Sequence, residues 1–389
     1  MNAHRTSVYL LVAAVIGLIV LGLVMLSSTG AFAPHNHGDP LFFLKRQMMW
    51  LGLAAIACCI GAWTDYHVFQ RGWWLLLAVS FVLLLLCFVP HVGIWVKGAW
   101  RWIHVGSFSF QPSEMAKLAA VATLAWWFAK DEERTRDFWK GFVLPLAGLA
   151  VFAAPIAREV DMGTTALLGA VTIIIMFVAG VRLRFLAPFL LAGLGGLAFV
   201  ITKMPNRLGR VLAFLYPDRP QYAGAAYQQL QGLIALGSGG AEGLGLGMGR
   251  QKMAFLPEAH TDFILPVIGE ELGLRITLLI VFAFVVILMC GGSIALRARD
   301  RFGMLFGFGI LMLITGQAAV NIGVTTMLLP NKGFPLPFIS YGGTNLVFCL
   351  SGIGILINIY RQGLNEKDER RAGVMLSART RNARRVVRL

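Results

Sequence analysis

Ionisable side chains recur at the ends of long apolar segments in this chain. Three of them are cations, namely Arg101, Lys117 and Lys332. An ionised side chain within a membrane helix costs about 2.5–3.5 kcal/mol on insertion scales, so each such residue is expected to be functional or paired. Three cations can bind a pyrophosphate group near the membrane surface. They therefore predict chemistry on a phosphorylated, lipid-linked substrate.

Acidic residues accompany the cations in the same segments. These candidates, together with one histidine, are Glu114, Asp161, Glu258, His260 and Asp262. A carboxylate beside a bound pyrophosphate can accept a proton from a hydroxyl. The whole set therefore predicts group transfer from a lipid pyrophosphate to a sugar hydroxyl.

For single residues a structural interpretation stays open. Glu114 and Lys117 lie three residues apart on one helical face and can form an ion pair that fixes packing. Arg101 and Asp161 can do the same, and an isolated histidine such as His260 is more often a hydrogen-bonding residue at a helix start than a base. The whole set on one face, with basic and acidic members both present, favours the functional interpretation.

The sequence lacks several motifs of other enzyme classes. It has no G-x-S-x-G, no H-E-x-x-H and no Cys/His metal spacing. The glycine-rich run 237–249 is not a phosphate-binding loop, because no Lys-Ser/Thr follows it; it is expected to be a surface loop or a loop that gates a ligand. The five cysteines lie in apolar runs and are interpreted as packing residues. We therefore expect no organic cofactor.

The elements that must position these residues are membrane helices. The chain of 389 residues is 57% hydrophobic and only 14% charged, whereas soluble domains carry about 25% charged residues. Apolar runs long enough to span a bilayer recur throughout and predict an all-α polytopic membrane protein with about ten transmembrane helices. The expected spans are 8–28, 47–64, 73–90, 112–129, 140–157, 163–181, 185–202, 263–291, 304–327 and 343–361.

Basic residues indicate the orientation of these spans. The stretches 130–140, 182–184 and 297–301 and the region after Arg361 are basic and fall on the side of the N-terminus, so both termini are expected to be cytoplasmic. Residues 1–364 then form one transmembrane domain, with a large extracytoplasmic loop between spans seven and eight. Residues 365–389 are expected to be a basic, disordered cytoplasmic tail.

The net charge of +15 has the same explanation. Basic cytoplasmic loops and attraction to anionic lipid account for it. Nucleic acid is excluded as a partner, because no basic patch with interleaved aromatic residues is present. The apolar run from Val8 to Met25 is longer than a signal-peptide core, so it is expected to be an uncleaved first span rather than a cleaved signal.

Three long segments resemble signature motifs of the SEDS family (shape, elongation, division and sporulation). They are "GAWRWIHVGSFSFQPSEMAKL", "LPEAHTDFILPVIGEELG" and "PNKGFPLPFISYGGTNL". The resemblance covers nearly the whole chain, from Val8 to Gln362. It implies a peptidoglycan glycosyltransferase that polymerises lipid II into β-1,4 glycan strands outside the cytoplasmic membrane, with undecaprenyl pyrophosphate as leaving group.

The resemblance also implies roles for individual residues. The family's essential aspartate falls on Asp262, which would act as general base on the acceptor hydroxyl. Pyrophosphate binding would fall on Arg101, Lys117, Lys332, Arg207 and Arg210, and support on Glu114, Asp161, Glu258, His260 and Ser340. A divalent cation, Mg²⁺ or Mn²⁺, could be held by Asp161, Glu258 and Asp262. The chain departs from the family pattern at Trp100, Val160 and Arg275, of which Arg275 could pair with Glu271.

The resemblance further implies partners and a location. The partner would be a cognate class B penicillin-binding protein (an FtsI-like transpeptidase) with other divisome proteins, and the location the bacterial inner membrane at the division septum. The segments "GDPLFFLKRQ", "LPEAHTDF" and "PNKGFPLP" favour the division type (FtsW-like) over the elongation type (RodA-like), which would perform the same chemistry. Two alternatives stay open: a flippase that moves lipid II across the membrane, and a scaffold that only recruits the transpeptidase.

Overall fold

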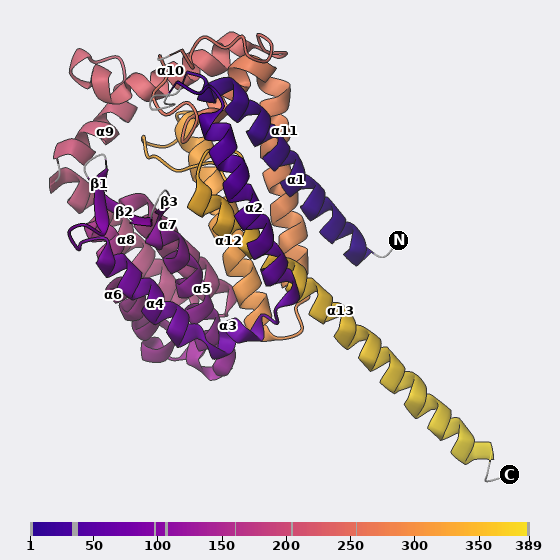
Figure 1. Ribbon diagram of the computed structural model, residues 1–389. Coiled ribbons are helices and arrows are strands. Elements are labelled where there is room, and N and C mark those ends of the chain that lie inside the picture. The colour runs from indigo at the N-terminus through magenta and orange to yellow at the C-terminus, as the bar shows by residue number, and fades with distance from the viewer. Residues whose placement is uncertain are drawn as a thin grey trace.

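The computed structural model describes residues 3–32, 38–96, 99–105, 108–159, 161–203, 205–253 and 255–386, and it describes side chains up to Leu364 except at a few positions, mostly between 192 and 207. Most of this chain is helical (Figure 1). The helices are α1 (Ala3–Gly30), α2 (Phe42–Trp63), α3 (His67–Arg71), α4 (Trp73–Leu86), α5 (Pro112–Lys130), α6 (Leu144–Arg158), α7 (Met162–Val178), α8 (Leu183–Lys203), α9 (Pro205–Leu215), α10 (Ala223–Gly239), α11 (Ile264–Ala295), α12 (Arg301–Thr325) and α13 (Gly343–Val386). A π-helical turn, Trp139–Val143, leads into α6, and 3-10 turns form at Glu132–Arg136 and Pro220–Tyr222.

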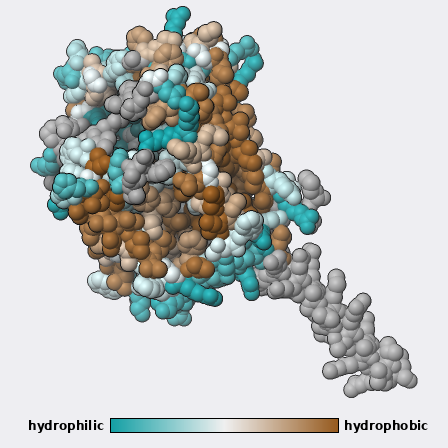
Figure 2. Space-filling view, viewed as in Figure 1, coloured by the Kyte–Doolittle hydropathy of each residue, from teal (hydrophilic) through white to brown (hydrophobic). Residues whose placement is uncertain are grey.

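Each predicted span overlaps one of these helices, and the count of ten membrane spans stays a prediction. Within the described residues, six segments are long and apolar enough to cross a membrane: Arg5–Gly30, Phe42–Trp63, Trp139–Arg158, Ile264–Ala295, Arg301–Thr325 and Gly343–Leu364. Helices α4 and α7 are apolar but shorter. The visible face carries a hydrophobic belt between two hydrophilic ends (Figure 2). The protein is therefore a multi-pass membrane protein.

The bundle has a long-helix half and a compact half (Figure 1). Helices α1, α2, α11 and α13 pack along one another, and α12 joins them to α5 and α7. Buried side chains of α5, α11 and α12 fill the centre, with Leu311, Ile310 and Val121 among the most deeply buried. Helix α1 contributes Leu11, Val15 and Met25 to that core, as expected of a span that belongs to the folded domain.

The segment 93–110 differs from the all-α prediction. It forms a three-stranded antiparallel sheet of β1 (Gly93–Val96), β2 (Ala99–Val105) and β3 (Phe108–Phe110), in the order β1-β2-β3. Ile103 is opposite both Gly93 and Phe110 in the register. The physical reason is an alternating pattern: Ala99 and Ile103 are buried, with aromatic residues between them. The sheet lies at the same end of the bundle as α9 and α10 (Figure 1).

Helix α11 is interrupted near its start. Gly273 has φ 79° and ψ 178°, a backbone conformation that favours glycine. The connection after α10 fills the break, because Leu244 N–H donates to Glu270 O (2.9 Å) and Leu274 N–H donates to Gly240 O (2.9 Å). The glycine-rich run is thus fixed into the helix break rather than being an independent surface loop.

The C-terminal helix extends beyond the bundle. α13 packs along α2 and then continues to Val386, away from the end that carries α10 (Figure 1). Its backbone is helical over residues that the composition predicts to be disordered, and the side chains beyond Leu364 lie outside the described part. The boundary at residue 364 and the tail's character stay predictions.

Candidate active site

A cavity of about 670 Å³ opens at the end of the bundle that carries the sheet. Its walls come from β2, the start of α5, the start of α7, the segment before α11 and the segment before α13. Five of the predicted site residues line it: Arg101, Glu114, Asp161, Glu258 and Asp262. Aromatic side chains of α2, among them Phe43 and Trp50, also line it. Charged and apolar walls in one cavity suit an amphiphilic ligand.

Asp262 lies in the irregular segment directly before α11, just outside the predicted span 263–291. The carboxylate of Asp262 faces Gly333, where a Cβ atom would overlap it. Glycine after Lys332 thus allows the backbone of the loop before α13 to approach the carboxylate. The backbone oxygen of Asp262 accepts a hydrogen bond from Asn321 on α12 (2.7 Å).

Asp161 and Lys332 form an ion pair with 3.4 Å between Oδ1 and Nζ. Asp161 caps α7, since its oxygens accept from Thr164 N–H (3.3 Å) and Thr164 Oγ1 (2.7 Å). Burial would raise the pKa of Asp161, but the charges of Lys332 and Arg101 and the Thr164 hydrogen bonds hold it below its ordinary value. Burial lowers the pKa of Lys332, against the charge of Asp161, which raises it.

Arg101 extends from β2 toward the connection between α6 and α7. Its Nε donates to the backbone oxygen of Glu159 (3.2 Å), and its charge acts on Asp161. The sequence prediction placed Arg101 in an outer loop, whereas the sheet gives it a fixed backbone. A guanidinium held in this way at a cavity wall can bind phosphate oxygens.

Glu159 is a buried carboxyl that the sequence analysis did not single out. It is 1% exposed, and the Cys87 thiol lies beside its carboxyl. Burial, and secondly the charge of Asp161, raise the pKa of Glu159 to about 8. A pKa raised in this way favours the protonated carboxyl near neutral pH.

Lys117 lies deeper than a pyrophosphate ligand would. Its Nζ donates to Glu114 Oε1 (2.9 Å) and to Gln317 Oε1 (2.9 Å), and the side chain is only 6% exposed. Glu114 Oε2 accepts from Asn345 (3.1 Å). Of this ion pair only Glu114 lines the large cavity. Lys117 is therefore joined to the site through Glu114. The two residues form the ion pair that their spacing of three residues allowed.

Ser340 and His260 hold the cavity segments together. Ser340 Oγ donates to Thr261 O (2.6 Å) and accepts from Leu336 N–H (2.8 Å). The backbone oxygen of His260 accepts from Tyr341 N–H (3.0 Å), and its ring lies against Phe43 with 4.6 Å between centroids. Neither side chain lines the cavity. Both residues support the backbone that carries Asp262.

Glu258 lines the cavity and closes the turn before Asp262. Its φ of 57° is unusual for a residue with a side chain. Its backbone oxygen accepts from Thr261 N–H (3.1 Å), and its carboxylate accepts from Thr261 Oγ1 (2.8 Å). Backbone strain at a cavity wall is typical of functional segments.

The two arginines of α9 are placed only in part. Arg210 is exposed, and its charge reaches Lys332, whose pKa it helps to lower. The side chain of Arg207 lies outside the described residues. Helix α9 itself lies at the end of the bundle that carries the sheet (Figure 1).

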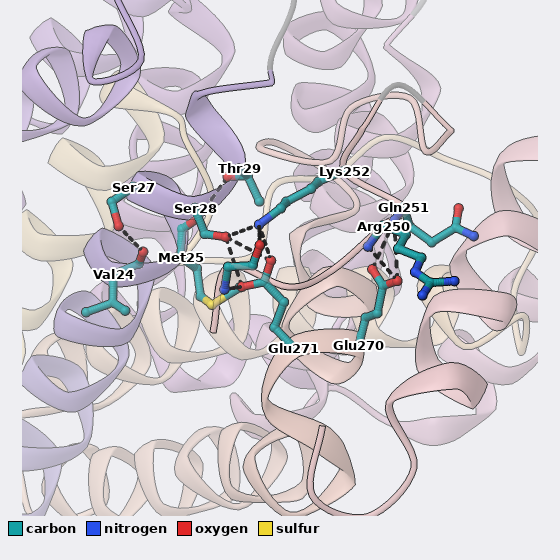
Figure 3. A network of polar contacts seen from close by, with 11 residues as sticks. Val24, Met25, Ser27, Ser28, Thr29, Arg250, Gln251, Lys252, Glu270 and Glu271 are labelled. Carbon is teal, nitrogen blue, oxygen red and sulfur yellow. Dashed lines mark hydrogen bonds and ion pairs between the residues drawn. The ribbon is translucent and has the colours of Figure 1, made fainter. Parts of the chain in front are cut away.

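Glu270 and Glu271 have a structural role. Glu271 is fully buried and accepts from Lys252 Nζ (2.6 Å) and Ser28 Oγ (2.8 Å), as Figure 3 shows. Glu270 accepts from the backbone N–H of Arg250 (2.9 Å). The two carboxylates thus anchor the loop that leads to Asp262.

The possible pairing of Arg275 with Glu271 is wrong. Arg275 pairs instead with Glu242 (3.2 Å), and both side chains are about three-quarters exposed. The reason is the break at Gly273, which separates Arg275 from the regular helical spacing to Glu271.

The sequence predicts a divalent cation at Asp161, Glu258 and Asp262. No group of three His, Cys, Asp or Glu side chains in the described residues lies close enough to hold a metal ion. Asp161 is engaged by Lys332 and Thr164, and Glu258 by Thr261. The divalent cation therefore stays a prediction, and no step below uses one.

Sequence reasoning missed the amides of α12. Gln317 and Asn321 lie four residues apart on one helical face and are 2% and 1% exposed. Gln317 binds Lys117 and Pro335 O (2.8 Å). Two polar residues at i and i+4 in an otherwise apolar span were the signal that could have found them.

Known proteins with similar sequences come from one family. Residues 9–364 match the family described as "Cell cycle protein". The chain is 40% identical over 346 residues to the "Probable peptidoglycan glycosyltransferase FtsW" of Geobacter metallireducens, covering 88% of this chain and 92% of that protein. It is 39% identical over 365 residues to the "Stage V sporulation protein E" of Bacillus subtilis, covering 93% of this chain and 99% of that protein.

Solved structures show the same fold. One, described as "Structural coordination of polymerization and crosslinking by a peptidoglycan synthase complex", has a TM-score of 0.73 at 26% identity and covers 91% of this chain and 97% of that chain. The rod shape determining protein RodA of Thermus thermophilus has a TM-score of 0.66 at 26% identity, and the match covers 90% of this chain and 95% of that chain.

Proposed function

Since the chain belongs to the cell cycle protein family, we propose that it is a peptidoglycan glycosyltransferase of the FtsW type that polymerises lipid II. The observation that carries this proposal is one cavity lined by Asp262, Arg101 and Asp161, with Lys332 paired to Asp161. A carboxylate that can act as base and the guanidinium of Arg101 then line one cavity together with apolar side chains, and Lys332 is joined to that cavity through Asp161. Such a site suits a donor that is a sugar on a lipid pyrophosphate.

The reaction uses these residues in two roles. Asp262 accepts the proton of the 4-hydroxyl of the acceptor's N-acetylglucosamine, and that oxygen attacks the anomeric carbon of the donor. The bond from that carbon to the pyrophosphate oxygen breaks, and undecaprenyl pyrophosphate leaves with the electron pair. Arg101 and Lys332 stabilise the negative charge that develops on the leaving group. Attack opposite the leaving group inverts the donor carbon and gives a β-1,4 link.

Lys117 has an indirect role in this proposal. Its ammonium fixes Glu114 at the cavity wall instead of binding pyrophosphate. Arg210, and with it Arg207, adds positive charge from α9. Glu258, His260 and Ser340 hold the backbone around Asp262.

The proposed topology follows from the helices. Ten helices, α1, α2, α4 to α8 and α11 to α13, cross the bacterial inner membrane, with both termini in the cytoplasm. The segment between α8 and α11 forms a large extracytoplasmic loop, so the cavity opens on the side where lipid II is polymerised. Residues 1–364 are the transmembrane domain, and 365–389 a basic cytoplasmic tail.

The proposed partners follow from the relatives. A cognate class B penicillin-binding protein would crosslink the strands that this chain makes. The structurally similar peptidoglycan synthase complex, which coordinates polymerization and crosslinking, supports such a partner. The 40% identity to an FtsW supports a division role at the septum with other divisome proteins, and an elongation role of the RodA type is the alternative.

Product analysis tests the proposal against transport. The purified full-length protein, with and without its transpeptidase, is incubated with labelled lipid II, and the products are separated by size. A ladder of glycan strands supports a polymerase. Lipid II that changes leaflet in vesicles without any longer product would instead indicate a flippase, and recruitment of the transpeptidase without either result would indicate a scaffold.

A further inference from the structure

A single amide joins the two irregular segments that carry Asp262 and Lys332. Asn321 Nδ2, on α12, donates to Asp262 O (2.7 Å) and to Phe334 O (2.5 Å). Asn321 is 1% exposed. Its two partners thus belong to the residue proposed as base and to the residue two positions after a proposed phosphate-binding lysine.

The orientation of this amide follows from its partners. Backbone oxygens only accept hydrogen bonds, so the NH₂ group of Asn321 must face both of them. Its Oδ1 atom is buried without a hydrogen-bond partner in the described structure. An unsatisfied buried acceptor is costly, and the two donor bonds must compensate for it. A buried amide of this kind is expected where two backbone segments must keep a fixed relative position, rather than where side chains only fill space.

The segments that Asn321 joins make close contact at the cavity. Gly333 lies between Lys332 and Phe334, and its α-carbon faces the Asp262 carboxylate so closely that a Cβ atom would overlap it. A small shift of either segment would therefore change the position of Asp262 relative to Lys332. Ser340, which binds Thr261 O, ties the same two segments at a second point.

We propose that Asn321 is a positioning residue for polymerisation, which sets the distance between the Asp262 carboxylate and the Lys332 ammonium by binding the backbone of both segments. This inference rests on the proposed function. Asn321 touches neither the donor nor the acceptor; it acts through the two backbone oxygens.

Gln229 provides a matched control. It lies on α10, is also 1% exposed, and its Nε2 also donates to two backbone oxygens, Val324 O (2.9 Å) and Leu329 O (2.9 Å). These bonds fix the end of α12 but do not involve the Asp262 segment or residues 332–334. A variant at Gln229 therefore loses the same kind of hydrogen bonds without changing the position of Asp262 relative to Lys332.

The experiment compares Asn321→Leu with Gln229→Leu in the full-length protein, by steady-state polymerisation of labelled lipid II and by thermal unfolding. We expect Asn321→Leu to lower kcat about 100-fold, since a displacement of about 1 Å at a reacting group has that effect, with KM within about twofold. Gln229→Leu is expected to keep kcat within about threefold of wild type. Its unfolding temperature should fall by about as much as that of Asn321→Leu. Equal losses of kcat in the two variants, or a kcat of Asn321→Leu within about threefold of wild type, would overturn the proposal.

Two further variants keep the result interpretable. If Asn321→Leu does not accumulate in membranes, Asn321→Ser, which keeps one donor, is measured in its place with a smaller expected loss of kcat. Asp262→Asn is measured alongside. If Asp262→Asn polymerises normally, the proposed base is wrong; if it is inactive while Asn321→Leu is active, only the role of Asn321 is wrong.

Discussion

The Asp161 carboxylate lies 3.4 Å from the Lys332 ammonium, and Asp161 lines the same cavity as Asp262. The pair joins the start of α7 to the loop before α13, two elements far apart in the sequence. Because Asp161 is also bound by Thr164, its position is fixed, and it determines where Lys332 can extend. Asp161 therefore orients a cation that, in the proposed mechanism, stabilises the leaving group.

This pairing predicts unequal effects of its two members. Lys332→Met should lower kcat/KM about 100- to 1,000-fold, because it removes a positive charge from the developing pyrophosphate. Asp161→Asn should lower it only about tenfold, since the lysine remains but is less well oriented. Initial rates of lipid II polymerisation measure both, and a larger loss in Asp161→Asn than in Lys332→Met would contradict this order.

Gly333 should tolerate no side chain. Gly333→Ala places a methyl group against the Asp262 carboxylate, and we expect a loss of polymerisation of about 100-fold because the carboxylate is displaced. Gly342→Ala in the same loop is the control, since its Cβ would meet only ordinary contacts at 3.8 Å and 3.9 Å. Rates and membrane abundance are measured for both variants. Equal activity in the two would show that Asp262 has room to move.

The buried Lys252–Glu271 pair should matter for stability. Lys252 and Glu271 are 1% and 0% exposed in their side chains, so Lys252→Met leaves an uncompensated buried carboxylate and should cost about 3–5 kcal/mol. Arg275→Ala, which breaks the exposed pair with Glu242, should cost about 0–1 kcal/mol. Denaturant unfolding in detergent compares the two variants. Similar small losses would mean that the loop anchoring by Glu271 is unimportant.

Glu159 should make stability depend on pH. Its pKa in the folded protein is about 8, against an ordinary value of 4.5, so between these values the folded state keeps a proton that the unfolded state releases. The stabilisation is complete below about pH 4.5 and is lost as the pH rises through about 8. Glu159→Gln does not titrate, so its unfolding temperature should fall less steeply between pH 5 and pH 8.5. Parallel curves for variant and wild type would contradict the raised pKa.

The sequence predicted the helical part of the fold because each span is a long apolar run. It missed the sheet, because three strands of four, seven and three residues give only a brief alternation between helices. Ala99, Arg101 and Ile103 alternate along β2, between the predicted spans 73–90 and 112–129. Short strands become stable only through their partners, which a single sequence does not reveal.

For the site, the residue types in the sequence indicated which side chains gather at the cavity, but not how deeply each one is buried. Five predicted residues line one cavity, because charges at the ends of apolar runs have few alternatives to a shared polar space. The depth of Lys117 could not be predicted, since its partner Gln317 lies 200 positions away. Asn321 was missed for a related reason: its importance depends on two backbone oxygens from distant segments.

The most direct measurement is polymerisation of labelled lipid II by purified Asp262→Asn, compared with wild type at equal membrane abundance and equal unfolding temperature. Asparagine keeps the shape of the side chain but cannot accept the acceptor's proton. The proposed mechanism predicts the loss of the glycan ladder, with lipid II binding retained. A ladder at the wild-type rate would contradict it.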